Sequence, residues 1–190
     1  MTTIEDILDK YGNGLTVKDF TAELDRTLSQ SGRPDPAALS SHDRATLVAV
    51  GVPEADLDAD VANDLIRTRA DNLVRLAGQS ATVQQVAARL HRTEQRIRSA
   101  IADGTLYGIK LGRGWRLPLW QLTEDSPLPQ LRRVIAAIPS GTPALAISNL
   151  MATPNRELFL DDAPASPADW LLAGGDPSRV EKLIADLLRS

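Results

Sequence analysis

The 190-residue chain has no cysteine, two histidines and few aromatic residues. Without cysteine it can form neither a disulfide framework nor a thiolate centre. His42 and His91 lie far apart and have no partners at metal-ligand spacing, so we expect no metal site. Aromatic residues make up only 4% of the chain, which favours small helical cores of Ala, Leu, Val and Ile over a β-sandwich.

A long apolar run and a leader sequence are also missing. No stretch approaches the roughly 18 apolar residues that a membrane helix needs. The first ten residues, MTTIEDILDK, have neither the basic nor the apolar region of a signal peptide. We therefore expect a cytoplasmic protein without membrane contact, and a chain without cysteine is compatible with that reducing compartment.

No group of residues indicates catalysis. The Gly-Arg-Gly run at 112–114 is too short to cradle a phosphate and opens no helix. The Gly-Gly-Asp run at 174–176 precedes a helical pattern but lacks the lysine of a P-loop. Because no nucleophile has a base and an orienting group beside it, we expect a protein that is not an enzyme and uses no cofactor.

Charge is distributed unevenly along a chain whose net charge is −4. Residues 79–121, the basic island, carry seven basic and two acidic side chains, whereas residues 1–78 and 122–190 have net charges of −6 and −3. A basic island in an acidic protein is typical of a nucleic-acid site, and the acidic flanks are expected to bind protein. The alternative is a helical hairpin whose arginines only keep it soluble.

The stretch 80–122 has the pattern of a helix-turn-helix followed by a hairpin. Thr82 and Thr93 are suited to cap two short helices, His91-Arg92 fills the turn between them, and Gly104 ends the second helix. Apolar residues recur at helical spacing in both helices; they are Val83, Val86, Ala87, Leu90, Ile97, Ala100 and Ile101.

A strand pattern from Thr105 to Leu111, a glycine-rich turn and a return at 115–117 predict a short β-hairpin beside the second helix. Side chains of the second helix would reach base edges, while those of the turn and the hairpin would hold phosphates. The expected DNA-binding residues are Thr82, Arg92, Thr93, Glu94, Gln95, Arg96, Arg98, Ser99, Lys110, Arg113 and Arg116.

The acidic N-terminal part, residues 1–78, is expected to be a helical bundle with helices at 2–11, from Thr16 onward, at 41–50 and at 59–77. Two interpretations are equally supported. The bundle either dimerises the protein, because two-fold DNA-binding proteins need an interface away from the reading helix, or packs against the helix-turn-helix.

A loop at 123–127 separates the DNA-binding domain, residues 79–122, from a C-terminal domain, residues 128–190. The overall expectation is a mainly α protein with this small helical domain at its end. Helices are predicted at 128–138 and 142–151, and two more begin at prolines after the caps Ser166 and Asp176. Residues 158–160 are expected to be extended, with Asp161-Asp162 in a solvated loop.

Two parts of the chain resemble known families. The run TVQQVAARLHRTEQRIRSAIADGTLYGIKLGRGWRLPLWQL is similar to the helix-turn-helix of MerR-like and excisionase-type DNA-binding proteins. The shared pattern is a "VA..L" first helix, an "IR..I..G.L" second helix and a basic "GR.WR.P" wing. The resemblance covers about forty residues and implies DNA binding. His91-Arg92 departs from it, because such proteins often have a glycine-containing turn.

The C-terminal region resembles the toxin-binding domain of MbcA/ParS/Xre-type antitoxins over about sixty residues. The matching features are TPN..L at 153–158, P.DWL..GGDP..V at 167–180 and a closing leucine-rich helix. Members of that family pair with RES-domain toxins, which consume NAD. The resemblance implies toxin contacts at Pro167, Trp170, Leu171, Gly174, Gly175, Asp176, Pro177 and Val180. From the residues alone, a tryptophan with two leucines is more often core than interface, and the Gly-Gly-Asp-Pro run is primarily a helix stop followed by a helix start.

The combined prediction is the antitoxin of a type II toxin–antitoxin system. It would bind double-stranded operator DNA as an autorepressor and homodimer, and it would neutralise a cognate RES-type toxin. The chain departs from the antitoxin family in its central DNA-binding part and its extra acidic N-terminal region. One alternative is a stand-alone MerR/excisionase-like transcriptional regulator whose tail only oligomerises it. Another is a structural adaptor whose basic island contacts protein.

Overall fold

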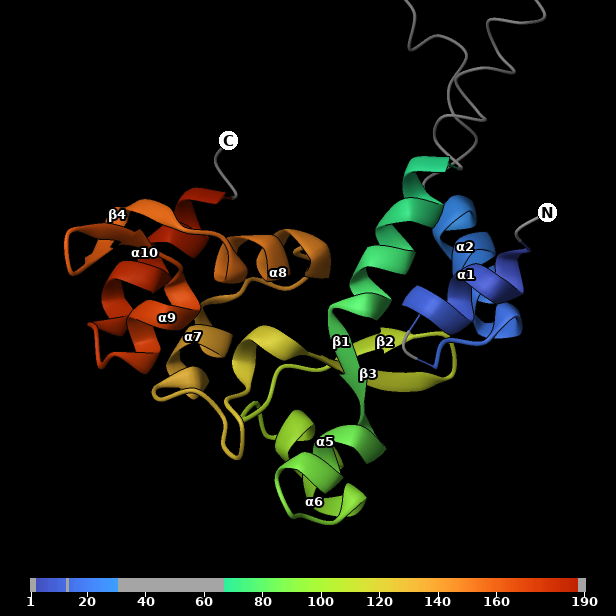
Figure 1. Ribbon diagram of the computed structural model, residues 1–190, viewed down its shortest axis with the longest axis horizontal. Coiled ribbons are helices and arrows are strands. Elements are labelled where there is room, and N and C mark those ends of the chain that lie inside the picture. The colour runs from blue at the N-terminus through green and yellow to red at the C-terminus, as the bar shows by residue number, and fades with distance from the viewer. Residues whose placement is uncertain (1–2, 13, 31–66, 188–190) are drawn as a thin grey trace, which may run out of the picture.

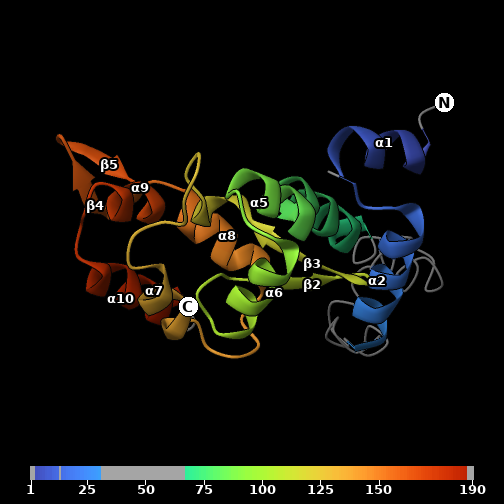
Figure 2. The same ribbon diagram turned by 90° about the horizontal axis from the view of Figure 1, so that it is seen from below.

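The computed structural model describes residues 3–12, 14–30 and 67–187. The described chain is rich in α-helix and contains two small antiparallel sheets. Three groups of elements follow one another along its longest axis (Figure 1), and the same order is seen from below in Figure 2. None of the described helices combines the length and the apolar character needed to cross a membrane.

The N-terminal group contains α1 (Ile4–Tyr11), α2 (Val17–Gln30) and a helix over 67–78. As predicted, α2 begins after Thr16, whose hydroxyl accepts the Asp19 N–H at 3.2 Å and donates to the Asp19 carboxylate at 2.8 Å. The predicted helix at 41–50 and the first part of the one at 59–77 lie outside the described residues.

The core of this group includes a residue of the basic island. Leu8, Leu15 and Phe20 pack with Leu73 of the helix over 67–78, and Leu111 completes the cluster with only 3% of its surface exposed. The described part of residues 1–78 therefore packs against the predicted hairpin, and dimerisation stays a prediction.

The central group is a three-stranded sheet in the order β1-β3-β2, accompanied by helices α5 (Val83–Arg89) and α6 (Glu94–Ala102). Its strands are β1 (Ser80–Thr82), β2 (Ile109–Leu111) and β3 (Gly114–Pro118). We call β2, the turn 112–113 and β3 the central hairpin. The sequence predicted this hairpin but not β1, which pairs antiparallel with β3.

The first hairpin strand is shorter than predicted, because it begins at Ile109 and not at Thr105. The backbone N–H groups of residues 105–107 form other hydrogen bonds. The N–H groups of Thr105 and Leu106 both donate to the Ala100 carbonyl at 2.9 Å, which closes the end of α6. The Tyr107 N–H donates to the Gln121 side chain at 2.7 Å. These groups are therefore not available to a strand ladder.

The C-terminal group follows a 3-10 turn, η2 (Leu119–Gln121). It consists of α7 (Leu131–Ala137), α8 (Ala144–Ala152), β4 (Asn155–Leu160), β5 (Ala163–Ala165), α9 (Pro167–Leu172) and α10 (Pro177–Leu187). The predicted extended piece at 158–160 lies within β4, but the sequence did not predict that β4 pairs with β5 in a hairpin. Helix α7 also starts later than predicted, at Leu131, because Gln130 has a left-handed φ of 58°.

The β4–β5 hairpin turns at Asp161 and Asp162, whose φ angles are 47° and 64°. A two-residue turn with both φ values positive has the twist that suits antiparallel strands. Aspartate tolerates this left-handed region better than most residues do. The two acids that the sequence placed in a solvated loop therefore form the tip of a hairpin.

Gln121 and Trp120 connect the central and C-terminal groups. The Gln121 side chain is fully buried; its amide nitrogen donates to the carbonyls of Tyr107 at 2.8 Å and Pro118 at 3.1 Å. With the N–H of Tyr107, three backbone groups depend on this one side chain. Trp120 packs against the cores of both groups and lies 6.1 Å from the Tyr107 ring, centroid to centroid.

We expect Gln121→Leu to lower the free energy of unfolding by about 1–3 kcal/mol, because it leaves buried backbone groups without partners. Urea denaturation followed by circular dichroism measures this loss. The matched control is Gln84→Leu on α5, where the side chain is exposed and the change should stay within about 0.5 kcal/mol. Equal losses in the two variants would contradict the role given to Gln121.

Candidate nucleic-acid interface and partner surface

Two threonine caps fix the start of α5 and α6, as the sequence predicted. The Thr82 hydroxyl accepts the N–H of Gln85 at 3.1 Å, and the Gln85 side chain accepts the N–H of Thr82 at 2.8 Å. Thr93 caps α6 by accepting the N–H of Arg96 at 3.3 Å. Each cap satisfies a backbone donor that the first turn of a helix leaves unpaired.

The turn between the helices is made by His91, whose φ of 51° is left-handed. This is the conformation for which glycine has the lowest cost, so the histidine occupies the place where the MerR-like pattern often has a glycine. The next residue closes the turn, as the Arg92 N–H donates to the Ala87 carbonyl at 2.9 Å. Gly104, with a φ of 71°, follows α6 in the predicted way.

Helix α6 has the predicted inward and outward faces. Ile97 is fully buried and Ala100 is 8% exposed, and both belong to the central core. The opposite side carries exposed polar residues at Gln95, Arg96, Arg98 and Ser99, with Glu94 partly buried. Arg98 forms an ion pair with Glu94 at 2.7 Å, whereas no interaction of the Arg96 side chain is seen among the described residues.

Helix α6 and the central hairpin border one open hollow of about 370 Å³. From the predicted DNA-binding set it is lined by Thr82, Glu94, Arg98, Arg113 and Arg116. The fold thus brings together side chains from the cap of α5, from α6 and from the hairpin turn. Asp19 of α2 and the residues Gly14 and Leu15 before this helix border the same hollow.

Trp115 also lines this hollow and was not among the predicted residues. Its side chain is 36% exposed, and the Lys110 ammonium lies 5.2 Å from the centre of its ring. A cation over an indole face is an attractive arrangement, and base or sugar surfaces also pack on exposed aromatic rings. The signal in the sequence was the Trp-Arg pair in the return strand, where alternation exposes only one of the two.

Arg116 differs from its expected role as a phosphate contact. Only 4% of its surface is exposed, because it lies in the middle strand of the sheet and on the opposite face from Trp115. Burial lowers the pKa of Arg116, and the nearby Asp19 carboxylate of α2 partly offsets this. Arg116 is therefore an internal cation facing the N-terminal group and is not part of the exposed basic surface.

The remaining basic side chains of the island divide into two kinds. Arg89 is held in place, since its Nε donates to the Thr123 carbonyl at 2.8 Å and connects α5 with the following loop. The exposed cations that remain for an anionic partner are Arg92, Arg96, Arg98, Lys110 and Arg113. They come from the turn, from α6 and from the central hairpin.

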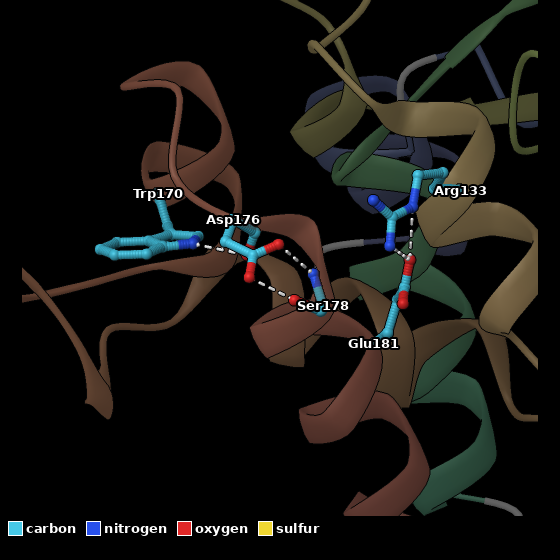
Figure 3. A network of polar contacts seen from close by, with 5 residues as sticks. All are labelled: Arg133, Trp170, Asp176, Ser178 and Glu181. Carbon is cyan, nitrogen blue, oxygen red and sulfur yellow. Dashed lines mark hydrogen bonds and ion pairs between the residues drawn. The ribbon is translucent and has the colours of Figure 1, made fainter.

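In the C-terminal group, Trp170 closes over the start of α10 (Figure 3). Its indole N–H donates to the Asp176 carbonyl at 3.0 Å, and the Arg179 guanidinium lies 5.4 Å from the centre of its ring. A Cβ added to Gly175 would overlap the ring, so only glycine fits at this position. The Trp-Leu-Leu and Gly-Gly-Asp-Pro runs thus form one packed unit.

Asp176 and Arg133 stabilise the start of α10 by polar contacts (Figure 3). The Ser178 N–H donates to one Asp176 carboxylate oxygen at 3.0 Å and the Ser178 hydroxyl donates to the other. These two hydrogen bonds lower the pKa of Asp176, that of the hydroxyl most strongly. Arg133 of α7 pairs with Glu181 of α10 at 2.9 Å.

Half of the predicted partner contacts are buried. The resemblance pointed to eight residues, but Pro167, Leu171, Pro177 and Val180 are buried, and Leu171 and Val180 belong to the C-terminal core with Met151 and Leu158. Trp170 and Gly175 are partly buried, and Gly174 and Asp176 are exposed.

The apolar residues exposed in the C-terminal group are different ones. Leu172 is 55% exposed and Phe159 is 51% exposed, and sequence reasoning singled out neither for a partner. For Leu172 the signal was present, because successive residues of a helix point about 100° apart and Leu171 and Leu172 cannot both enter one core.

The chain matches no protein-family model, no curated protein and no solved structure. A functional assignment therefore starts from the chemistry of these two surfaces.

We expect Ser178→Ala to raise the pKa of Asp176 toward the ordinary aspartate value. The substitution removes the Ser178 hydroxyl, whose hydrogen bond contributes most to lowering this pKa. A carboxylate whose pKa is lowered by folding stabilises the fold at any pH above its unfolded-state pKa. This contribution is lost as the pH falls through the folded-state pKa. Carboxyl-carbon NMR titration measures the shift. Asp6, whose pKa is lowered by Thr3, is the internal control and should titrate unchanged. An unaltered Asp176 curve would refute this assignment.

Proposed function

We propose that the chain is a DNA-binding antitoxin. In this proposal the central group binds operator DNA and represses its own promoter, and the C-terminal group binds a RES-type toxin. The observation that carries the DNA-binding half is the hollow shared by α6 and the central hairpin, which Arg98 and Arg113 line from two different elements.

We interpret α5, the His91 turn, α6 and the central hairpin as a winged helix-turn-helix. The major groove of B-DNA is wide enough for one α-helix, and base edges there are read by amides, hydroxyls and guanidinium groups. The exposed side of α6 offers these groups in Gln95, Arg96 and Ser99. In this proposal the exposed Arg92 of the turn and Arg113 of the hairpin contact phosphates.

Electrostatics support the same proposal. Six of the seven cations of the basic island are exposed, whereas the chain as a whole is acidic. Such an arrangement orients DNA toward one face and limits non-specific binding to the rest of the molecule. Because each neutralised phosphate releases counterions, the affinity should fall steeply as the salt concentration rises.

We expect the protein to bind a duplex carrying its own promoter, measured by fluorescence anisotropy over a salt series. Arg96→Ala should weaken binding by about 1–3 kcal/mol if this arginine reads a guanine. A plot of log K against log salt concentration falls with a negative slope. Arg113→Ala should make this slope shallower by about one, because one phosphate contact is removed.

The matched control is Arg156→Ala, which removes an exposed arginine from β4 in the C-terminal group. It changes the net charge equally and should leave the affinity nearly unchanged. An absence of duplex binding at low salt would refute the DNA-binding half, and an equal effect of Arg156→Ala would refute the location of the interface.

The toxin-binding half is supported by the surface around the end of α9. Leu172 is an exposed leucine two residues from Trp170, and the exposed Gly174 and Asp176 follow it directly. Large apolar side chains that are left exposed at a surface are candidates for contact with a protein partner. We therefore place the toxin contact on Leu172, the exposed part of Trp170 and Asp176, and not on the buried residues of the motif.

We expect Leu172→Asp to weaken co-purification with the product of the neighbouring gene while leaving DNA binding and the far-UV spectrum unchanged. Ala152→Asp, at the exposed end of α8, is the charge-matched control and should retain the partner. If both variants retain the partner equally, this surface is not the contact.

A stand-alone MerR/excisionase-like regulator is the second candidate function. The burial of Pro167, Leu171, Pro177 and Val180 favours it, because packing within the fold is enough to account for these four residues. Such a regulator would bind its promoter but co-purify with no neighbouring gene product. In either case we propose a homodimer on a two-fold operator, since half-sites require two reading helices.

A further inference from the structure

Helix α2 directs an acidic side chain at the tip of the basic hairpin. Glu23 is only 6% exposed, and its carboxylate accepts the Gly112 N–H at 3.2 Å. Arg26, one helical turn further along α2, pairs with the same carboxylate and donates to it from its Nε at 3.2 Å. The Glu23 hydrogen bond and charge raise the pKa of Arg26.

The hairpin turn is fitted to α2 in two further ways. Gly112 has a φ of 60°, and a Cβ there would come within 2.6 Å of the Asp19 Cβ, so both backbone conformation and space require glycine. The preceding Leu111 is buried in the core of the N-terminal group. The turn is therefore held by the hydrogen bond to Glu23 and the close approach of Asp19, both from α2, and by Leu111 in the core of the N-terminal group.

Arg113 is the exposed residue that this turn presents to the hollow. It stands between Gly112 and Gly114, and glycine gives a chain more conformational freedom than any other residue. An arginine between two glycines would sample many positions unless the turn is held from outside. Fixing such a side chain before binding lowers the entropic cost of the contact.

We propose that Glu23 is a positioning residue for DNA binding, which fixes the hairpin turn so that Arg113 meets a phosphate. The proposal rests on the DNA-binding function proposed above. It means that an acidic residue strengthens binding to a polyanion. The charge of Glu23 is not presented to DNA, because the carboxylate is buried and shared between Arg26 and the Gly112 N–H.

The opposite role would be that Glu23 competes with DNA, occupying the Gly112 N–H in place of a phosphate oxygen. Such competition requires α2 to leave the turn when DNA binds. Leaving would expose Leu111, which is 3% exposed, together with Leu15 and Phe20, which are each 6% exposed. Exposing that much apolar surface is costly, so the geometry favours positioning. The two roles predict effects of opposite sign.

The test uses the full chain and compares Glu23→Ala, Glu23→Gln and the control Asp25→Ala, an exposed acid on the same helix. Hydrogen exchange of the Gly112 amide measures the turn, and anisotropy with the promoter duplex measures binding. Glu23→Ala should remove the protection and weaken binding about fivefold. Glu23→Gln should restore most of both, since its amide oxygen still accepts a hydrogen bond. Asp25→Ala should weaken neither.

A double-mutant cycle with Arg113→Ala separates positioning from general damage to the fold. If Glu23 acts through Arg113, Glu23→Ala should have almost no further effect on binding in the Arg113→Ala background. Tighter binding by Glu23→Ala, or an equal loss in both backgrounds, would overturn the proposal. If the wild-type chain binds no duplex, the DNA-binding function itself fails, and exchange at Gly112 still shows whether Glu23 holds the turn.

Discussion

The middle position of β3 is the constraint on which the rest of the structure depends. This strand pairs with β1 on one side and with β2 on the other. Helix α5 starts directly after β1, η2 starts directly after β3, and α2 packs on the tip of the central hairpin. Because side chains alternate along a strand, the same pairing exposes Trp115 and buries Arg116. The three groups of elements thus take their positions from one strand of five residues.

Local features of the fold could be predicted from the sequence, whereas pairings between distant segments could not. The caps Thr82 and Thr93 and the stop at Gly104 act within one helical turn, so nearby residues determine them. β1 was missed because its three residues become a strand only by pairing with β3, over thirty residues later. The β4–β5 hairpin was missed because its turn is Asp-Asp and lacks the glycine that usually marks such turns.

The candidate sites follow the same rule. Helical periodicity alone gave the outward face of α6, and the structure confirms that face. Arg116 was expected to contact phosphate but is buried, and the exposed Trp115 was missed, because the environment of this strand depends on α2, which is distant in sequence. In the C-terminal group a family motif does not distinguish residues that pack from residues that bind, and the buried Leu171 beside the exposed Leu172 illustrates this. Burial in the folded chain supplied the missing distinction.

Trp120 contributes packing to the cores of both the central and the C-terminal group. Neither group can therefore be removed without uncovering an indole that the other has helped to bury. A chain ended at the 123–127 loop would expose the apolar surface of Trp120, just before the cut, and this would favour self-association. In a deletion variant, the loss of specific contacts would be confounded with new self-association. Single surface substitutions are therefore the better way to separate the two proposed binding functions.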